Sequence, residues 1–185
     1  LRRAGLAGAM QSNDRSQIMR HLLIGASLAG VALLGTWGAA QQAPKWAIDL
    51  NNATGKLSAH PKEYVQMTTS IGAIIFTLIT PIIGDILGRR LTYSICCALA
   101  GLSAVAFYQL CHSIDTTFYI AAFFMGGLTA TFYGFFPLYL PELFPTSVRA
   151  TGQGFCFNVG RIIAAVGGLQ IANLVGLFGT ADTPA

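Results

Sequence analysis

Charged side chains are the residues of this sequence best suited to chemistry, and several lie in short segments between long apolar stretches. Asp85 ends one apolar stretch, and Arg89 and Arg90 begin the next. If both stretches are helices, the anion lies at a helix C-terminus and the cations at a helix N-terminus, where the helix dipoles disfavour them. A cross-helix ion pair would explain both signs, and a solvated turn is the alternative.

A second charged segment follows a later apolar stretch and holds Glu142 and Arg149. Pro141 and Pro145 are predicted to end the preceding helix, because proline cannot continue the hydrogen-bond ladder. This segment is expected on the same membrane side as Asp85. The hypothesis is a cluster of ion pairs that makes and breaks as helices move, formed by Asp85, Arg89, Glu142 and Arg149.

A lone arginine lies near the middle of the last apolar stretch. Arg161 is about nine residues into it, or roughly 13 Å at helical rise. A cation at that depth costs about 2.5–3.5 kcal/mol on insertion scales, so it usually faces water or a partner. With Asn158 and Gln170 in the same stretch, the pattern indicates the wall of a solute path. Snorkelling to the inner interface is the alternative.

Trp37 and Gln41 lie toward the outer end of the first apolar stretch and could also contact a solute. An interfacial anchor with a polar neighbour is the simpler interpretation of this pair.

The positions of the cysteines, histidines and basic residues argue against metal binding, catalysis and nucleic-acid binding. The four cysteines lie in apolar stretches without a C-x-x-C pair, which favours reduced, buried packing residues. The three histidines lie in separate end or loop regions, and no two catalytic groups pair within a span. Basic runs interleaved with aromatic residues are missing. We therefore expect no metal site, no cofactor, no nucleic-acid partner and no enzyme.

Composition places these residues in a membrane. The 185 residues are 54% hydrophobic and only 10% charged, whereas soluble domains carry about 25% charged residues. Uncharged stretches long enough to cross a core of about 30 Å as helices recur along the chain. The sequence thus predicts an all-α polytopic bundle in a lipid bilayer, with about five spans at 22–43, 64–87, 91–112, 116–140 and 152–178.

Basic residues set the direction of the spans. With a cytoplasmic N-terminus, seven arginines lie inside and three lysines outside, as the positive-inside rule prefers. The plasma membrane is the expected location. Residues 1–20 are expected to be a cytoplasmic loop, 44–63 a polar outer loop, and 182–185 a tail.

Small residues recur every fourth position in the last two spans and predict close helix packing within one bundle. They are Ala122, Gly126, Ala130 and Gly134, then Gly160, Ala164, Gly168, Ala172 and Gly176.

Two loop motifs resemble those of the major facilitator superfamily. One is the Asp-x-x-Gly-Arg-Arg core of residues 85–90, whose family form, G-x-x-x-D-x-x-G-R-R, has a glycine where Pro81 stands here. The other is Pro-Glu-Leu-Phe-Pro-Thr-x-x-Arg-Ala-Thr-Gly over residues 141–152. The loop itself is similar to that of sugar-porter-like and organic-acid symporter members, and its extension through Arg161 is similar to the sialate and aromatic-acid proton symporter groups.

The resemblance implies helices seven to eleven of a twelve-helix transporter, with a six-helix N-terminal half as the missing partner. Such transporters work by alternating access. By the same likeness, cytoplasmic gate roles fall to Asp85, Gly88, Arg89, Arg90, Glu142 and Arg149.

The expected function is secondary transport of a small solute, an organic anion or carboxylate by proton symport. Sodium is the other coupling ion considered, and a sugar or polyol is the alternative solute. A receptor or sensor on the same scaffold is the alternative of another class. The acidic residues lie at helix ends, in loops or in the tail, so a proton site would belong to the missing half.

Overall fold

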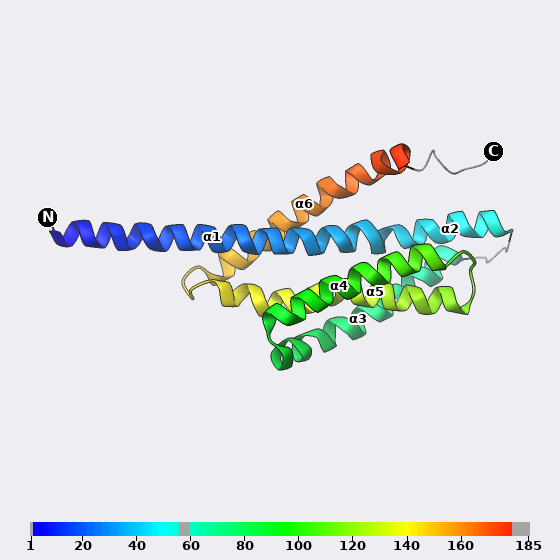
Figure 1. Ribbon diagram of the computed structural model, residues 1–185, viewed down its shortest axis with the longest axis horizontal. Coiled ribbons are helices and arrows are strands. Elements are labelled where there is room, and N and C mark those ends of the chain that lie inside the picture. The colour runs from blue at the N-terminus through cyan, green and yellow to red at the C-terminus, as the bar shows by residue number, and fades with distance from the viewer. Residues whose placement is uncertain (1, 56–59, 179–185) are drawn as a thin grey trace.

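The computed structural model describes residues 2–55 and 60–178, and the regular elements within them are all helices (Figure 1). In chain order they are α1 (Arg2–Ala39), η1 (Ala40–Gln42), α2 (Ala43–Thr54), α3 (Pro61–Leu87), α4 (Arg89–Leu110), α5 (Thr116–Tyr139), η2 (Leu140–Leu143) and α6 (Arg149–Phe178). The predicted all-α bundle is confirmed. The tail predicted at 182–185 lies outside the described residues.

Four helical stretches in the described part are long and apolar enough to cross a membrane. Three of them contain the spans predicted at 64–87, 91–112 and 116–140, apart from a residue or two at their ends, and the other contains the span at 22–43. The fifth predicted span, 152–178, falls within the 30 residues of α6.

The helix ends follow from local chemistry. Pro61 occupies the first turn of α3, where its missing N–H costs no hydrogen bond. The Asp115 carboxylate caps α5 by accepting a hydrogen bond from the Phe118 backbone N–H at 2.8 Å. At its other end α5 gives way at Tyr139 to η2, which holds Pro141. The prediction that proline ends this helix is confirmed.

Two segments expected to be loops contain helix instead. Residues 2–20 belong to α1, and they are rich in Ala, Leu, Met, Arg and Gln, which are strong helix formers. Residues 43–54 form α2 at the start of the segment predicted to be a polar loop. That segment is polar on average, but Ala43, Ala47 and Leu50 are buried against Val65 and Phe118. One apolar helix face therefore escapes a prediction based on mean polarity.

The helices pack as two close pairs, α1 with α6 and α3 with α5. Glycine makes both approaches possible. A methyl group built on Gly126 of α5 would lie 2.6 Å from Thr69 Cα of α3. A methyl group built on Gly160 of α6 would lie 2.8 Å from Ala29 Cβ of α1. The predicted close packing within one bundle is confirmed at these positions.

The small-residue pattern holds less well farther along α6. A methyl group on Gly168 would meet nothing within 4 Å, whereas one on the neighbouring Gly167 would collide with Leu34 of α1. The side chains of Ala172 and Gly176 lie outside the described part of the structure. The helical period of 3.6 shifts the contact stripe relative to a strict four-residue repeat, which explains the change of position.

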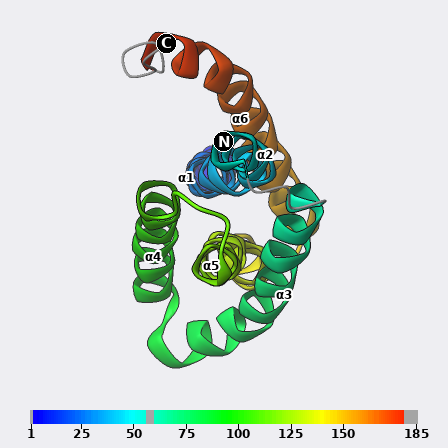
Figure 2. The ribbon, with the colours of Figure 1, turned by 90° about the vertical axis from the view of Figure 1, so that its right-hand side faces the viewer.

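The core consists of two clusters of buried side chains, one toward each end of the bundle. α5 contributes to both clusters. It lies between α3, α4 and α1, as Figure 2 shows. Phe132, Phe135 and Phe136 anchor the cluster at the end near η2. Phe107, Phe118 and Met125 anchor the other. Three of the four cysteines are buried in these clusters as small apolar side chains: Cys96, Cys111 and Cys156.

Candidate functional site

A single residue, Gly88, joins α3 to α4 at the end of the bundle near η2. Its backbone has φ of 82° and ψ of 156°, a region that side chains with a Cβ rarely adopt. A Cβ at this position would nevertheless meet open space. The glycine is therefore required by backbone conformation alone, and this conformation sets the direction in which Arg89 leaves the turn.

Replacing Gly88 with alanine is expected to destabilise the protein by about 1–3 kcal/mol, the cost of forcing a side-chain-bearing residue into this backbone region. The free energy of unfolding, measured by titrating the purified protein from mild detergent into SDS, checks this value. Gly154→Ala is the matched control, since its methyl group also meets open space. Equal losses of unfolding free energy in the two variants would contradict this prediction.

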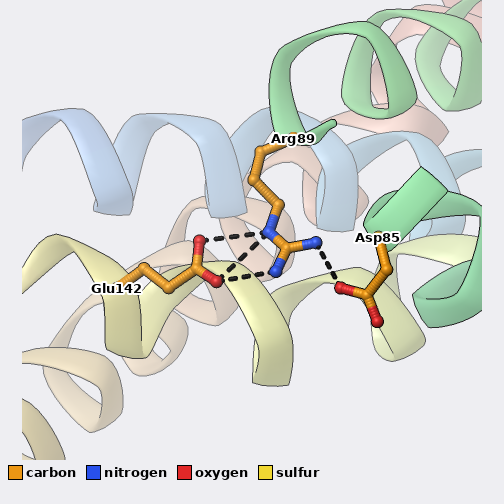
Figure 3. Close-up of polar contacts among 3 residues, drawn as sticks. All are labelled: Asp85, Arg89 and Glu142. Carbon is orange, nitrogen blue, oxygen red and sulfur yellow. Dashed lines mark hydrogen bonds and ion pairs between the residues drawn. The ribbon is translucent and has the colours of Figure 1, made fainter. Parts of the chain in front are cut away.

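Arg89 bridges the α3–α4 turn and η2 (Figure 3). Its Nη1 donates to Asp85 Oδ1 at 2.8 Å, and its Nη2 donates to Glu142 Oε1 at 2.7 Å. Its Nε lies 3.2 and 3.1 Å from the two carboxylate oxygens of Glu142. The planar guanidinium thus uses its fork on Glu142 and its remaining edge on Asp85. We call these three residues the Arg89 cluster.

The Arg89 cluster resolves the unfavourable helix dipoles noted in the sequence. Asp85 at the C-terminus of α3 and Arg89 at the N-terminus of α4 neutralise each other across the turn. The Asp85 side chain is 64% exposed, that of Glu142 46% and that of Arg89 24%. Hydrogen bonds from Arg89 hold the pKa of the Glu142 carboxyl below its usual value. Because water reaches all three groups, the contacts can break at small cost.

Two arginines of the predicted gate lie outside these contacts. Arg149 begins α6 and turns its Nε toward the Phe144 carbonyl oxygen at 3.5 Å. Arg90 is exposed and makes no ion pair with the described residues. The structure therefore brings together Asp85, Arg89 and Glu142, while the role of all these residues as a gate stays a prediction.

The predicted path residues lie on the exposed surfaces of α6, α1 and η1. On α6, the Arg161 guanidinium lies 4.9 Å from the centre of the Phe157 ring, close enough for a cation–π contact. Asn158 donates to the Gly154 carbonyl of its own helix, and Asn173 donates to Gln170. Trp37 of α1 is 45% exposed, and Gln41 of η1 is also exposed. Among described residues, no hydrogen bond joins these two residues to those of α6.

Hydroxyl groups that cross between helices were not predicted. Thr36 of α1 donates to the Thr129 carbonyl of α5 at 2.8 Å, and Thr77 of α3 donates to the Ala130 carbonyl at 3.1 Å. Tyr93 and Tyr108 of α4 donate to the Leu28 and Ala39 carbonyls of α1. The sequence did contain a signal for these bonds, namely threonine and tyrosine residues within apolar spans. A hydroxyl group in lipid needs a hydrogen-bond partner.

Comparison with known proteins gives several relatives. The chain is 34% identical over 101 residues to the "Cis,cis-muconate transport protein" of Acinetobacter baylyi, which is 53% of this chain and 23% of the relative. It is 33% identical over 121 residues to the "Probable 4-methylmuconolactone transporter" of Cupriavidus pinatubonensis, 59% of this chain and 27% of the relative. It is 33% identical over 110 residues to the "Inner membrane metabolite transport protein YhjE" of Escherichia coli, 57% of this chain and 25% of the relative.

These relatives are members of the superfamily that the two loop motifs resemble. The chain is similar to members of the major facilitator superfamily over 53–59% of its length. No family model and no solved structure gives a significant match. The matched part of this chain spans about a quarter of the length of each of these three relatives. The similarity agrees with the four apolar helical stretches of the described residues, which indicate a multi-pass integral membrane protein.

Proposed function

We propose that the protein containing this chain is a secondary transporter that carries small organic anions by alternating access. Two observations support the anionic substrate. Two relatives are named for muconate and methylmuconolactone transport. The chain itself presents an exposed cation within an apolar helix.

The proposal of an anionic substrate rests mainly on Arg161. It is exposed on α6, and no carboxylate of the described residues forms an ion pair with it. The ring of Phe157 supports the guanidinium from one side. The guanidinium edge then remains available for a bidentate contact with a carboxylate, which is the geometry that arginine favours. Asn158, one turn earlier, adds a polar side chain beside it.

The test is uptake of radiolabelled cis,cis-muconate by cells that express the complete open reading frame containing this chain. Arg161→Gln is expected to raise the KM for muconate at least about fivefold, because a charged hydrogen-bonding partner is lost. Arg161→Lys keeps the charge without the fork and is expected to lie in between. Lys45→Gln, which removes an exposed cation from α2, is the matched control.

Other outcomes of the same assay contradict this proposal. Saturable glucose uptake without muconate uptake would identify a sugar transporter. A protein that reaches the membrane but takes up neither solute would favour a receptor or sensor. Equal KM values for Arg161→Gln and Lys45→Gln would remove Arg161 from the solute path.

In this proposal the cytoplasmic gate contains the residues of the α3–α4 turn and of the segment after α5. They are Asp85, Gly88, Arg89, Arg90, Glu142 and Arg149. The support is the Arg89 cluster, which ties three elements together through solvent-exposed contacts. Contacts of this kind stabilise one conformer and can be broken without a large barrier.

Proton symport is the coupling we propose, with sodium as the other candidate. The described carboxylates lie at or beyond the ends of the apolar spans, so the proton carrier belongs elsewhere, in a six-helix partner half. Collapse of the proton gradient is expected to stop muconate uptake, whereas removal of sodium is expected to leave the rate of uptake unchanged. The proposed orientation has the N-terminus in the cytoplasm and the protein in the plasma membrane, which the arginine-rich inner segments support.

A further inference from the structure

Two cavities follow one another along the contact between α1 and α4. The first, of about 210 Å³, lies at the end near η2 and is lined by Arg89, Arg90, Tyr93 and Ser94 of α4. The second, of about 260 Å³, lies farther along the same helices and is lined by residues such as Gly35 of α1. Figure 2 shows α1 and α4 beside α5, whose side chains line both cavities.

The first cavity is cationic. Arg89 is committed to Asp85 and Glu142, but Arg90 is exposed and forms no ion pair with the described residues. Ser94, one helical turn from Arg90, lines the same wall, and its hydroxyl donates to the Arg90 carbonyl at 3.1 Å. The Arg90 guanidinium is therefore the group of this wall that can bind a phosphate at the membrane surface.

The second cavity is lined mainly by apolar residues. Gly35 and Gly101 form part of its wall, and a methyl group on either would meet open space. Val31, which lines it, is 65% exposed, so the groove opens at the surface of the described bundle. Because α1 and α4 are apolar enough to cross a membrane, hydrocarbon rather than water is expected to have access to the groove.

The two cavities share one lining strip. Leu28 and Tyr93 line the first, and Ala32 and Cys97, one turn farther along each helix, line the second. The hydrogen bond from the Tyr93 hydroxyl to the Leu28 carbonyl, at 3.1 Å, forms the neck between them. From Arg90 to Ala104 the helical rise is roughly 21 Å. One leaflet of hydrocarbon is about 15 Å thick, so the strip matches a headgroup followed by one acyl chain.

We propose that this strip binds an anionic phospholipid. The phosphate occupies the first cavity beside Arg90, and one acyl chain lies over Tyr93 in the groove between α1 and α4. Arg90 lies at the opening of the first cavity, and no ion pair with a described residue neutralises its positive charge. The site therefore favours a lipid with a negatively charged headgroup. The site is distinct from the proposed solute path, because Arg161 lies on α6.

The test is lipid retention, measured by native mass spectrometry on the purified protein with equal amounts of phosphatidylglycerol and phosphatidylcholine. The wild type is expected to retain phosphatidylglycerol at least about fivefold over phosphatidylcholine. Arg90→Gln is expected to abolish that excess. Gly101→Leu, which fills the groove, is expected to lower retention of both lipids. Inorganic phosphate in excess is expected to leave retention unchanged.

Matched variants separate this site from general attraction to lipid. Arg20→Gln removes another exposed arginine on the proposed cytoplasmic side, and Gly154→Leu places a leucine where a methyl group meets open space outside the groove. Both are expected to behave as wild type. Equal retention of the two lipids, or equal effects of test and control variants, would overturn the proposal. Displacement by inorganic phosphate without any effect of Gly101→Leu would leave a simple anion pocket and would overturn it too.

Discussion

Alanine at position 134 is expected to force α3 and α5 apart and to destabilise the protein by about 3 kcal/mol. Its added methyl group would collide with the Thr77 carbonyl oxygen of α3. A backbone atom cannot swing aside as a side chain can, so the whole helix has to move. The same displacement would break the hydrogen bond from Thr77 to the Ala130 carbonyl. The free energy of unfolding from an SDS titration measures the loss.

The control for this prediction is again Gly154→Ala on α6. Alanine is the better helix former, and a methyl group at Gly154 meets nothing within 4 Å. Its stability is therefore expected to stay within about 1 kcal/mol of wild type or to rise. A Gly134→Ala protein as stable as this control would show that α3 and α5 do not approach through Gly134.

Arg89→Gln is expected to release both Asp85 and Glu142, and so to loosen η2 from the α3–α4 turn. Glutamine lacks the charge and the fork that hold the two carboxylates together. Hydrogen–deuterium exchange is expected to rise about tenfold in peptides covering 85–92 and 140–149, since the charge-assisted contacts of Arg89 with both carboxylates are lost. Exchange at the far end of the bundle, around the Asp115 cap, is expected to stay unchanged.

The neighbouring arginine supplies a matched control. Arg90→Gln removes the same charge from the same turn but breaks no ion pair among the described residues. Its exchange pattern is expected to match wild type. Arg89→Lys keeps the charge without the planar fork, so an intermediate rate is expected. Equal exchange in Arg89→Gln and Arg90→Gln would show that net charge, and not the Arg89 cluster, holds these elements.

Much of this fold could be predicted from uncharged runs because the membrane-spanning helices must satisfy their own backbone hydrogen bonds in lipid. The uncharged runs do not predict α2. Its apolar stripe of Ala43, Ala47 and Leu50 is too narrow to raise the mean hydropathy of a polar segment. Its burial depends on Val65 and Phe118 from other elements, and a local pattern does not contain that information.

The site was predictable to the extent that local electrostatics decided it. Wrong-signed charges at two helix ends indicated that Asp85 and Arg89 neutralise each other, and one turn is enough to place them. The position of Arg149 depends on how the chain runs between η2 and α6, which only the packed bundle determines. Threonine shows the same limit: Thr69 bonds its own helix, whereas Thr36 also reaches α5.

The pairing of α1 with α6 has a consequence for how the protein is made. Leu22 and Cys156, which meet where these helices cross, are 134 residues apart in the chain. At 5–20 residues per second, about 7 to 27 seconds separate their synthesis. Throughout that interval the glycine-lined face of α1 is already in the membrane without its partner. Another molecule, lipid or an insertion factor, has to cover this face, and cellular quality control can recognise a complete α1–α6 pair only after α6 is made.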